Sequence, residues 1–275
     1  MAVRPLKQTV IYAVLIIYAL LNIYPLFWML NNSLKSDQEI ALHPFALPSS
    51  LSFANFSTAW ESASLGPFFV NSLVVSLIAL TVTVLLGALA SYFLSRIKFK
   101  GSGMLYSFFI VGMLVPVHAT LVPVFLVEKN LNILNTWVSL VLPYTAFHLP
   151  ITIFILTSFM GSFHKDIEES AVMDGCGIFE VFFRIILPMT RPALATVIIL
   201  NFIYNWNEFS FALVLVNNEA LKTLPLAIAG LTGEFSSSLG PQMAALTMAI
   251  VPTIVIYLIL EKQLVKGMTA GAVKG

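Results

Sequence analysis

Six long apolar stretches divide this chain, and they constrain its fold more than any other feature of the sequence. A transmembrane helix needs roughly 20 mostly apolar residues to cross the hydrocarbon core of a bilayer. Only 10% of the 275 residues are charged, whereas a typical soluble domain has about 25%. We therefore expect an all-α integral membrane protein with a single transmembrane domain over residues 1–275. The six expected spans lie at about 9–30, 68–95, 104–127, 136–159, 192–216 and 242–261.

The first stretch follows Arg4 and Lys7, an arrangement that secretory signal peptides also have. It is about as long as a bilayer is thick, and no A-x-A cleavage site follows it. We expect an uncleaved first span.

Several of the stretches contain proline. Membrane helices tolerate proline where neighbouring helices bond the freed carbonyl groups. We expect bent helices around a cavity. The prolines concerned are Pro25, Pro116, Pro123, Pro143, Pro150 and Pro252.

The distribution of lysine and arginine predicts the orientation, because cytoplasmic loops of membrane proteins are enriched in these residues. If the chain has six spans, three basic residues lie on one side of the membrane, namely Lys35, Lys129 and Lys222. The other side holds eleven, namely Arg4, Lys7, Arg96, Lys98, Lys100, Lys165, Arg184, Arg191, Lys262, Lys266 and Lys274. Both termini are therefore expected in the cytoplasm, with external loops at 31–67, 128–135 and 217–241. The first of these loops has room for a short helix around Phe53–Glu61.

The longest cytoplasmic loop, residues 160–191, is expected to form two short helices bent at a glycine. Asp166 is placed to cap the first helix, with Glu169 three residues later completing a capping-box arrangement. Gly175 provides the left-handed conformation that ends a helix. Pro188 stops the second helix, and Pro192 suits the first turn of the next span.

The two faces of this loop differ in character. The second helix is expected to place Phe179, Phe182, Phe183 and Ile186 on one apolar face toward the bundle. Glu168, Glu169 and Asp174 are expected to point to the cytoplasm. One interpretation is an amphipathic helix on the membrane surface with solvated acids. The inner leaflet is anionic and favours basic helices, so an acidic surface suits a protein partner better.

Residues 169–188 resemble the pattern E-A-A-x3-G-x9-I-x-L-P, the EAA motif of membrane subunits of ATP-binding-cassette (ABC) importers. The motif begins here at Glu169, has its glycine at Gly175 and ends at Pro188. Ser170 replaces the first alanine, a small-for-small change that we expect to pack closely. In the family this loop is the coupling helix, which inserts into a cleft on the ATPase subunit.

Two further stretches are similar to the carbohydrate-uptake, binding-protein-dependent branch of these permeases, the branch of the maltose system. They are NWNEF at 205–209 and MTAGAVKG at 268–275, and the likeness covers essentially the whole chain. The resemblance implies the type I ABC importer permease architecture and a role in ATP-driven sugar import. The residues that it assigns to ATPase coupling are Glu168, Glu169, Ser170, Ala171, Asp174, Gly175, Ile185, Leu187 and Pro188.

The chain contains no G-x-x-x-x-G-K-[ST] sequence to bind a nucleotide. The resemblance implies a transport subunit rather than an enzyme, with no cofactor in this chain and with ATP and Mg bound by separate ATPase subunits. The implied partners are a second homologous permease, two ABC ATPases and an extracellular or periplasmic sugar-binding protein. The implied location is the bacterial or archaeal cytoplasmic membrane.

The fifth span contains a polar group of residues. Asn201, Asn205 and Glu208 are spaced to share one helical face, with Tyr204 and Trp206 beside them. A carboxylate in hydrocarbon costs at least a few kcal/mol, so Glu208 is expected to face a cavity or a partner. Amides and aromatic rings suit a sugar path, but the same amides also bond helices together. Both interpretations remain open. In the maltose system, the bound sugar is held mainly by the partner permease.

An alternative function is an ion-coupled secondary transporter that uses Glu208, His118 and His148 as a relay. An intramembrane hydrolase is a further alternative, but the sequence lacks a recognisable nucleophile–base pair. His43, His164 and Cys176 show no metal-ligand spacing, so no metal site is expected.

The roles expected for one external loop and for the C-terminal tail rest only on the resemblance. The loop at 231–241 resembles the segment that contacts the sugar-binding protein, with Glu234 and Phe235 as contacts. The glycine-rich tail, expected at 262–275 in the cytoplasm, resembles the segment that reaches between the ATPases. Its candidate contacts are Thr269, Ala270 and Gly271.

Overall fold

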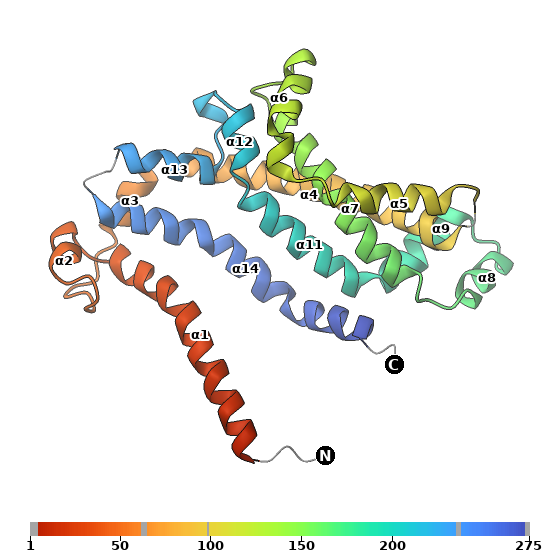
Figure 1. Cartoon of the computed structure of the whole chain (residues 1–275), viewed down its shortest axis with the longest axis horizontal. Helices are drawn as coiled ribbons and strands as arrows, with labels where there is room; N and C mark the ends of the chain where they lie inside the picture. Colours follow the sequence, from red (N-terminus) through yellow and green to blue (C-terminus); the bar gives the residue numbers. More distant parts are fainter. Residues whose placement is uncertain (1–4, 62–64, 98, 235–237, 273–275) are drawn as a thin grey trace. The chain divides into compact units, whose positions relative to one another are not determined.

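The computed structural model describes residues 5–61, 65–97, 99–234 and 238–272. Within these ranges, only the backbone is described at 5–7, 231–234 and 262–272. Every regular element in these ranges is a helix (Figure 1). Two compact units divide the chain, Met1–Pro67 with Ala227–Val251 and Phe68–Leu226 with Pro252–Gly275. The longer helices are α1 (Pro5–Ser33), α4 (Leu65–Arg96), α5 (Ser102–Gly112), α6 (Leu121–Asn130), α7 (Val138–Met160), α11 (Arg191–Trp206), α13 (Leu224–Glu234) and α14 (Leu239–Ala272).

Among the described residues, four helices are individually long and apolar enough to cross a membrane. The helices expected at 9–30, 68–95, 136–159 and 242–261 are therefore confirmed. The segments that meet the criterion are Gln8–Ser33, Leu65–Arg96, Val138–Met160 and Leu239–Glu261.

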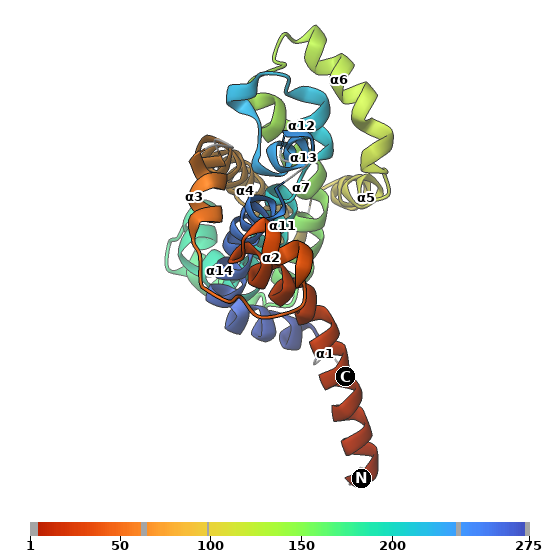
Figure 2. The ribbon, with the colours of Figure 1, turned by 90° about the vertical axis from the view of Figure 1, so that its left-hand side faces the viewer.

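The third expected span is not one helix. α5 ends at Gly112, and after a short 3-10 turn at Val117–Thr120 the chain continues at an angle of 94° to α5 (Figure 2). Pro116 explains the break, because proline lacks an N–H group and disfavours the helical conformation in the residue before it. The stretch expected over 104–127 is therefore two helices with a sharp bend, as its prolines indicated.

The fifth expected span, 192–216, is also interrupted. α11 ends at Trp206, and α12 (Ser210–Leu215) begins after a three-residue break. At its other end, α11 lies at 77° to the apolar segment Ile178–Met189. If each bent pair counts as one span, the described residues provide up to six candidate spans.

α7 is the central helix of the unit Phe68–Leu226 with Pro252–Gly275. It contacts α5, α11 and α12, and it also meets α4, where the Ser91 hydroxyl lies 3.3 Å from the Ile153 carbonyl. Gly87 permits the close approach of α4, since a Cβ atom there would lie only 2.5 Å from Cγ2 of Thr152. Small residues at helix contacts allow such approach in membrane proteins. Two clusters of buried apolar side chains form the core along this helix, one around Phe182 and the other around Tyr144.

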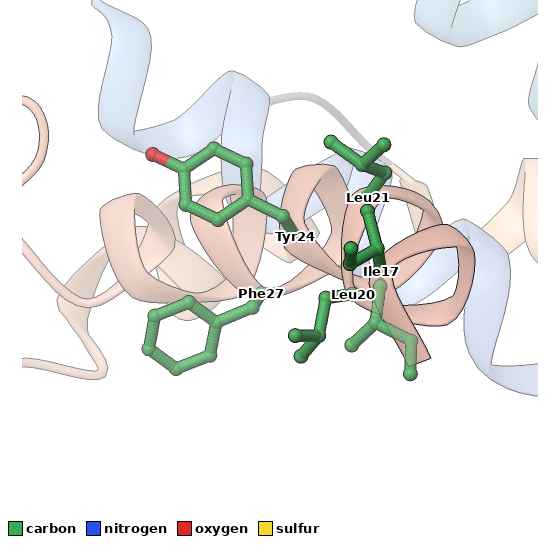
Figure 3. Close-up of a pocket in the computed structure, with 6 residues that line it drawn as sticks. Ile17, Leu20, Leu21, Tyr24 and Phe27 are labelled. Atoms are coloured by element: carbon green, nitrogen blue, oxygen red, sulfur yellow. The ribbon is translucent and has the colours of Figure 1, made fainter. Parts of the chain in front are cut away.

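In the unit Met1–Pro67 with Ala227–Val251, α1 is exposed along most of its length. No charged residue occurs from Gln8 to Ser33, and the side chains from Gln8 to Phe27 are exposed. One face has a shallow apolar hollow of about 400 Å³ lined by Ile17, Leu20, Leu21, Ile23, Tyr24 and Phe27 (Figure 3).

The segment after α1 is more ordered than the loop expected at 31–67. The short helix expected around Phe53–Glu61 is confirmed as α3 (Ala54–Glu61). A further helix, α2 (Asp37–Leu42), begins after Ser36. The Ser36 hydroxyl accepts a hydrogen bond from the backbone amide of Glu39. Ser36 and Glu39 form the Ser-x-x-Glu pattern typical of helix starts, a signal that could have predicted α2.

Lys35 fixes the start of this segment. Its side chain is buried, and its ammonium group donates to Oδ1 of Asn32 at 3.1 Å and to the carbonyl of His43 at 3.0 Å. Asn55 bonds the carbonyls of Ser33 and Lys35. These bonds satisfy polar groups that would be costly to bury alone.

The expected external loop at 217–241 contains α13. Its sequence, LPLAIAGLTGE, is apolar, and Pro225 lies in its first turn, a favoured position for proline in a helix. The segment expected as an external loop therefore includes a helix, which extends into the part expected to be flexible at 231–241.

Candidate functional site

The candidate site is the segment between α7 and α11, and its first helix is α8 (Asp166–Met173). Gly175 has a φ of 87°, which confirms the predicted left-handed conformation. The Gly175 amide bonds the carbonyl of Val172, and the Cys176 amide bonds the carbonyl of Ala171, each at 3.0 Å. These two bonds form a Schellman motif, which gives the chain a defined turn after α8.

The start of α8 differs from the prediction. Lys165 occupies the N-cap position with a helical backbone, and no side chain bonds the cap. Asp166 is already the first helical residue, and its carbonyl accepts the Ser170 hydroxyl at 2.7 Å. The capping-box prediction is wrong because the first helical turn begins one residue earlier, where the Glu169 amide bonds the carbonyl of Lys165.

The second helical part is not a regular α-helix. α9 (Ile178–Val181) continues into a π-helical turn at Phe182–Ile186 and then α10 (Leu187–Met189). Phe182 and Ile186 are buried, whereas the side chains of Phe179 and Phe183 are exposed. The expected single apolar face toward the bundle is therefore wrong for Phe179 and Phe183, whose rings contact Phe93 and Phe182 but stay more than half exposed.

The three acids of the loop have two different environments. Glu169 and Asp174 are exposed. The side chain of Glu168 is only 17% exposed and forms an ion pair with Arg96 at the end of α4. The expectation that all three acids point to solvent is therefore wrong for Glu168.

The other predicted coupling residues lie at different depths. Ser170 is exposed, so the close packing expected there is wrong, whereas Ala171 is buried in the same core cluster as Phe182. Ile185, Leu187 and Pro188 are half-buried.

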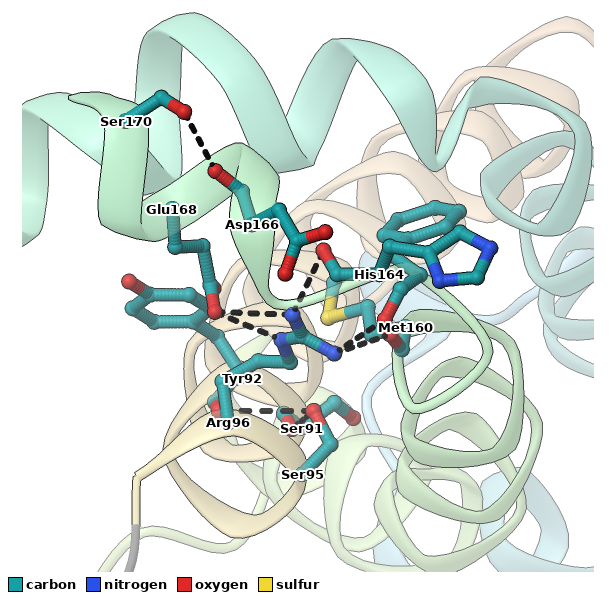
Figure 4. A network of polar contacts seen from close by, with 10 residues as sticks. Ser91, Tyr92, Ser95, Arg96, Met160, His164, Asp166, Glu168 and Ser170 are labelled. Atoms are coloured by element: carbon teal, nitrogen blue, oxygen red, sulfur yellow. Dashed lines mark hydrogen bonds and ion pairs between the residues drawn. The ribbon is translucent and has the colours of Figure 1, made fainter.

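Sequence reasoning missed the contact between Arg96 and this loop. Figure 4 shows the Arg96 side chain between Glu168 and the carbonyl groups that follow α7. The two paired residues are 72 positions apart. The only sequence signal was the position of Arg96 at the end of an apolar stretch.

The polar group of the fifth span is mostly buried within the chain. Asn201 is fully buried and donates to the hydroxyl of Thr152 on α7 at 2.8 Å. Asn205 and Trp206 are also buried, and the Trp206 ring stacks on Phe202. These contacts favour a role in joining helices for Asn201.

Tyr204 is the exposed member of this group. Its side chain is 55% exposed, and its ring stacks on His148 with 5.3 Å between centroids. His148 is mostly shielded by its neighbours, whereas His118 is exposed in the 3-10 turn after Pro116.

Glu208 lies in the break between α11 and α12, not on the helical face expected for it. Its carboxylate accepts the Tyr144 hydroxyl at 2.8 Å and the amides of Phe211 and Ala212 at 2.7 and 3.2 Å. The partner predicted for this acid is therefore present. Glu208 serves as a cap for α12 and links it to α7.

Replacing this cap should weaken the fold. Glu208→Ala is expected to lower the free energy of unfolding by about 1–2 kcal/mol, because two amides and a buried hydroxyl lose their acceptor. Glu208→Gln retains one acceptor oxygen and should have a smaller effect. Thermal unfolding of both variants in detergent checks this, and equal melting temperatures for Glu208→Ala and the wild type would contradict it.

The remaining predicted contacts fall partly outside the described residues. Phe235 lies outside them, and so does the side chain of Glu234 at the end of α13. Thr269, Ala270 and Gly271 have a helical backbone in α14, but their side chains also lie outside the described part.

Comparison with known proteins agrees with this architecture. The chain is 36% identical over 268 residues to the probable ABC transporter permease protein YurM of Bacillus subtilis, a match that covers 98% of this chain and 89% of the relative. It is 35% identical over 262 residues to the diacetylchitobiose uptake system permease protein NgcG of Streptomyces coelicolor, covering 94% and 87% of the two chains.

A solved structure shows the same fold. It is the crystal structure of a bacterial ABC transporter involved in the import of the acidic polysaccharide alginate, with a TM-score of 0.83 and 22% identity. The match covers 96% of this chain and 99% of the chain in that structure. Residues 83–270 match the family described as the binding-protein-dependent transport system inner membrane component. The chain thus belongs to the family of inner membrane components of binding-protein-dependent transport systems.

Proposed function

We propose that this chain is the membrane-spanning subunit of an ATP-driven sugar importer and that α8 with its following turn transmits force from an ATPase. The observation that carries the proposal is the rigid turn after α8, with Glu169 and Asp174 exposed around it. The core cluster that contains Phe182 packs the opposite face of this segment. An exposed acidic surface on a packed base is suited to a protein partner.

In this proposal the chain crosses the membrane six times, and both termini lie in the cytoplasm. α5 with α6 serves as the third span and α11 with α12 as the fifth, and the eleven basic residues counted above lie on the cytoplasmic side. This orientation also places α8 there. Closure of two docked ATPases would then rock the helices between inward-open and outward-open states.

The proposed complex contains a second, homologous permease, two ABC ATPases that bind ATP and Mg, and an external sugar-binding protein. The exposed apolar face of α1 leaves a large surface for the second permease or for lipid. Glu234 and Phe235 remain proposed contacts for the binding protein, and Thr269, Ala270 and Gly271 remain proposed contacts for the ATPases.

A sugar is the proposed substrate because the names of the relatives specify diacetylchitobiose and alginate. We place the sugar path along Tyr204, the exposed aromatic residue of α11. Asn201, Asn205 and Trp206 lie behind it, and Glu208 lies at the helix break. An aromatic face offers an apolar surface to the C–H groups of a sugar.

Reconstitution tests this function. The permease pair, with and without its ATPases, is placed in vesicles together with the binding protein and labelled diacetylchitobiose or alginate oligosaccharide. We expect uptake of at least one of these sugars only when both ATP and the ATPases are present. Uptake driven by a proton gradient without ATPases would instead support the ion-coupled alternative with Glu208, His118 and His148.

A further inference from the structure

Arg96 occupies a position that its role as a cytoplasmic basic residue does not explain. It is the last residue of α4, and its side chain is only 3% exposed. We propose that Arg96 is a positioning residue that fastens α8 to α4 and α7, so that a force on α8 moves those two helices with it. This inference rests on the proposed coupling role of α8.

The guanidinium group of Arg96 has five polar contacts, which match its five N–H donors. Nε and one terminal nitrogen both bind Oε2 of Glu168, at 3.0 and 2.8 Å. The other contacts are with backbone carbonyl oxygens at 2.9–3.4 Å, those of Met160, Phe163 and His164. One side chain therefore joins three segments, namely the end of α4, the end of α7 and the first turn of α8 (Figure 4).

The helix ends favour these charges. The carbonyl groups at the end of α7 carry partial negative charge, which attracts the cation. Glu168 lies in the first turn of α8, where the amide groups carry partial positive charge and favour an acid. Each charge of the pair is therefore stabilised by the nearby helix terminus as well as by its partner.

Burial separates this pair from an ordinary surface ion pair. Exposed pairs contribute little because water and salt screen them. The pair between Glu180 and Arg184 in the same loop is of that kind, with side chains 38% and 76% exposed. It provides a matched control, since it joins two residues of one short segment and reaches neither α4 nor α7.

α4 and α7 are themselves held together, so both receive the force. The Ser91 hydroxyl on α4 lies 3.3 Å from the Ile153 carbonyl on α7, and the two helices approach closely at Gly87. Beside Arg96, the core cluster also packs Tyr92 of α4 against Phe182. Arg96 is the charged connection from this helix pair to α8.

The geometry distinguishes arginine from lysine. A lysine ammonium has three donors on a flexible stem and cannot reproduce the planar set of five. Arg96→Lys retains the charge but should lose part of the connection. Glu168→Gln leaves the carbonyl contacts of Arg96 in place and weakens only the link to α8, so it tests the inference even if Arg96→Lys fails to fold.

The first measurement is the distance between spin labels on α8 and α4 in the reconstituted complex with its ATPases. Met173→Cys and Leu86→Cys, both exposed positions, receive the labels in a Cys176→Ala background. We expect a narrow distribution that stays the same without nucleotide and with ATP plus vanadate. Arg96→Lys and Glu168→Gln should broaden it, whereas Glu180→Gln should not. A distribution as narrow as that of the wild type in both variants would overturn the inference.

The second measurement is the number of sugar molecules imported per ATP hydrolysed, and the probe is whichever of diacetylchitobiose and alginate oligosaccharide the wild-type complex imports. Arg96→Lys and Glu168→Gln should lower this ratio about tenfold, while ATP hydrolysis continues. If the wild-type complex imports no sugar with ATP, the proposed function fails, but the label distances still decide whether Arg96 holds α8.

Discussion

Gly175→Val is expected to reduce ATP-driven uptake by about tenfold or more. Gly175 has a φ of 87°, and a side chain with a Cβ atom costs about 1–2 kcal/mol in the left-handed region, more for a β-branched residue. An added Cβ would meet no atom within 4 Å. The effect therefore arises from the backbone turn and not from a steric clash.

Two control variants separate these causes. Gly175→Asn should retain most activity, because asparagine tolerates the left-handed conformation. Gly177→Val lies two residues away, where the backbone is extended and a Cβ would also meet open space, and it should be nearly neutral. The measurement is uptake per ATP hydrolysed in vesicles that contain the assembled complex. Normal transport by a fully assembled Gly175→Val complex would contradict the coupling role of this turn.

Gly87→Ala should destabilise the contact between α4 and α7 by up to about 2 kcal/mol net. The new Cβ would lie 2.5 Å from Cγ2 of Thr152, a side chain that is fully buried. The Thr152 hydroxyl accepts a hydrogen bond from the Asn201 side-chain amide at 2.8 Å. Rotating the Thr152 side chain away from the new Cβ would break this bond. Overpacking of this kind costs about 1–3 kcal/mol, and the better helix propensity of alanine offsets about 1 kcal/mol.

A double variant makes this test specific. Thr152→Ser removes Cγ2 but keeps the hydroxyl, so Gly87→Ala with Thr152→Ser should recover most of the loss. Gly103→Ala, where a Cβ would meet nothing within 4 Å, should not lower stability. Thermal unfolding in detergent measures all four proteins. A melting temperature for Gly87→Ala at or above that of the wild type would show that α4 and α7 can separate without cost.

Hydropathy predicted the helices that run without interruption. α1, α4, α7 and α14 each contain a continuous apolar stretch of bilayer length, and their positions were confirmed. The same criterion could not predict the breaks at Pro116 and Glu208. Apolar stretches lie on both sides of each break, whereas the direction of the chain changes with the local hydrogen bonds.

The candidate site was predicted where the signal was local. The turn at Gly175 followed from the sequence around it, since a glycine after a short polar helix is typical of a helix end. The pairing of Arg96 with Glu168 could not be predicted, because neighbouring residues contain no information on which distant side chains meet. The burial of Phe182 without Phe183 depends on distant neighbours such as Tyr92, for which the local sequence shows no equally clear pattern.

The π turn at Phe182–Ile186 allows this segment to lose one residue without a large change in the direction of its later side chains. A π-helical bond spans five residues where an α-helical bond spans four, so the turn stores one residue beyond the α-helical count. Each residue of an α-helix advances the direction of its side chains by about 100°. Losing one residue from the π turn would therefore return this segment to a regular α-helix with little rotation of Leu187 and Pro188, whereas losing one from a regular α-helical turn would rotate every later side chain by about that angle.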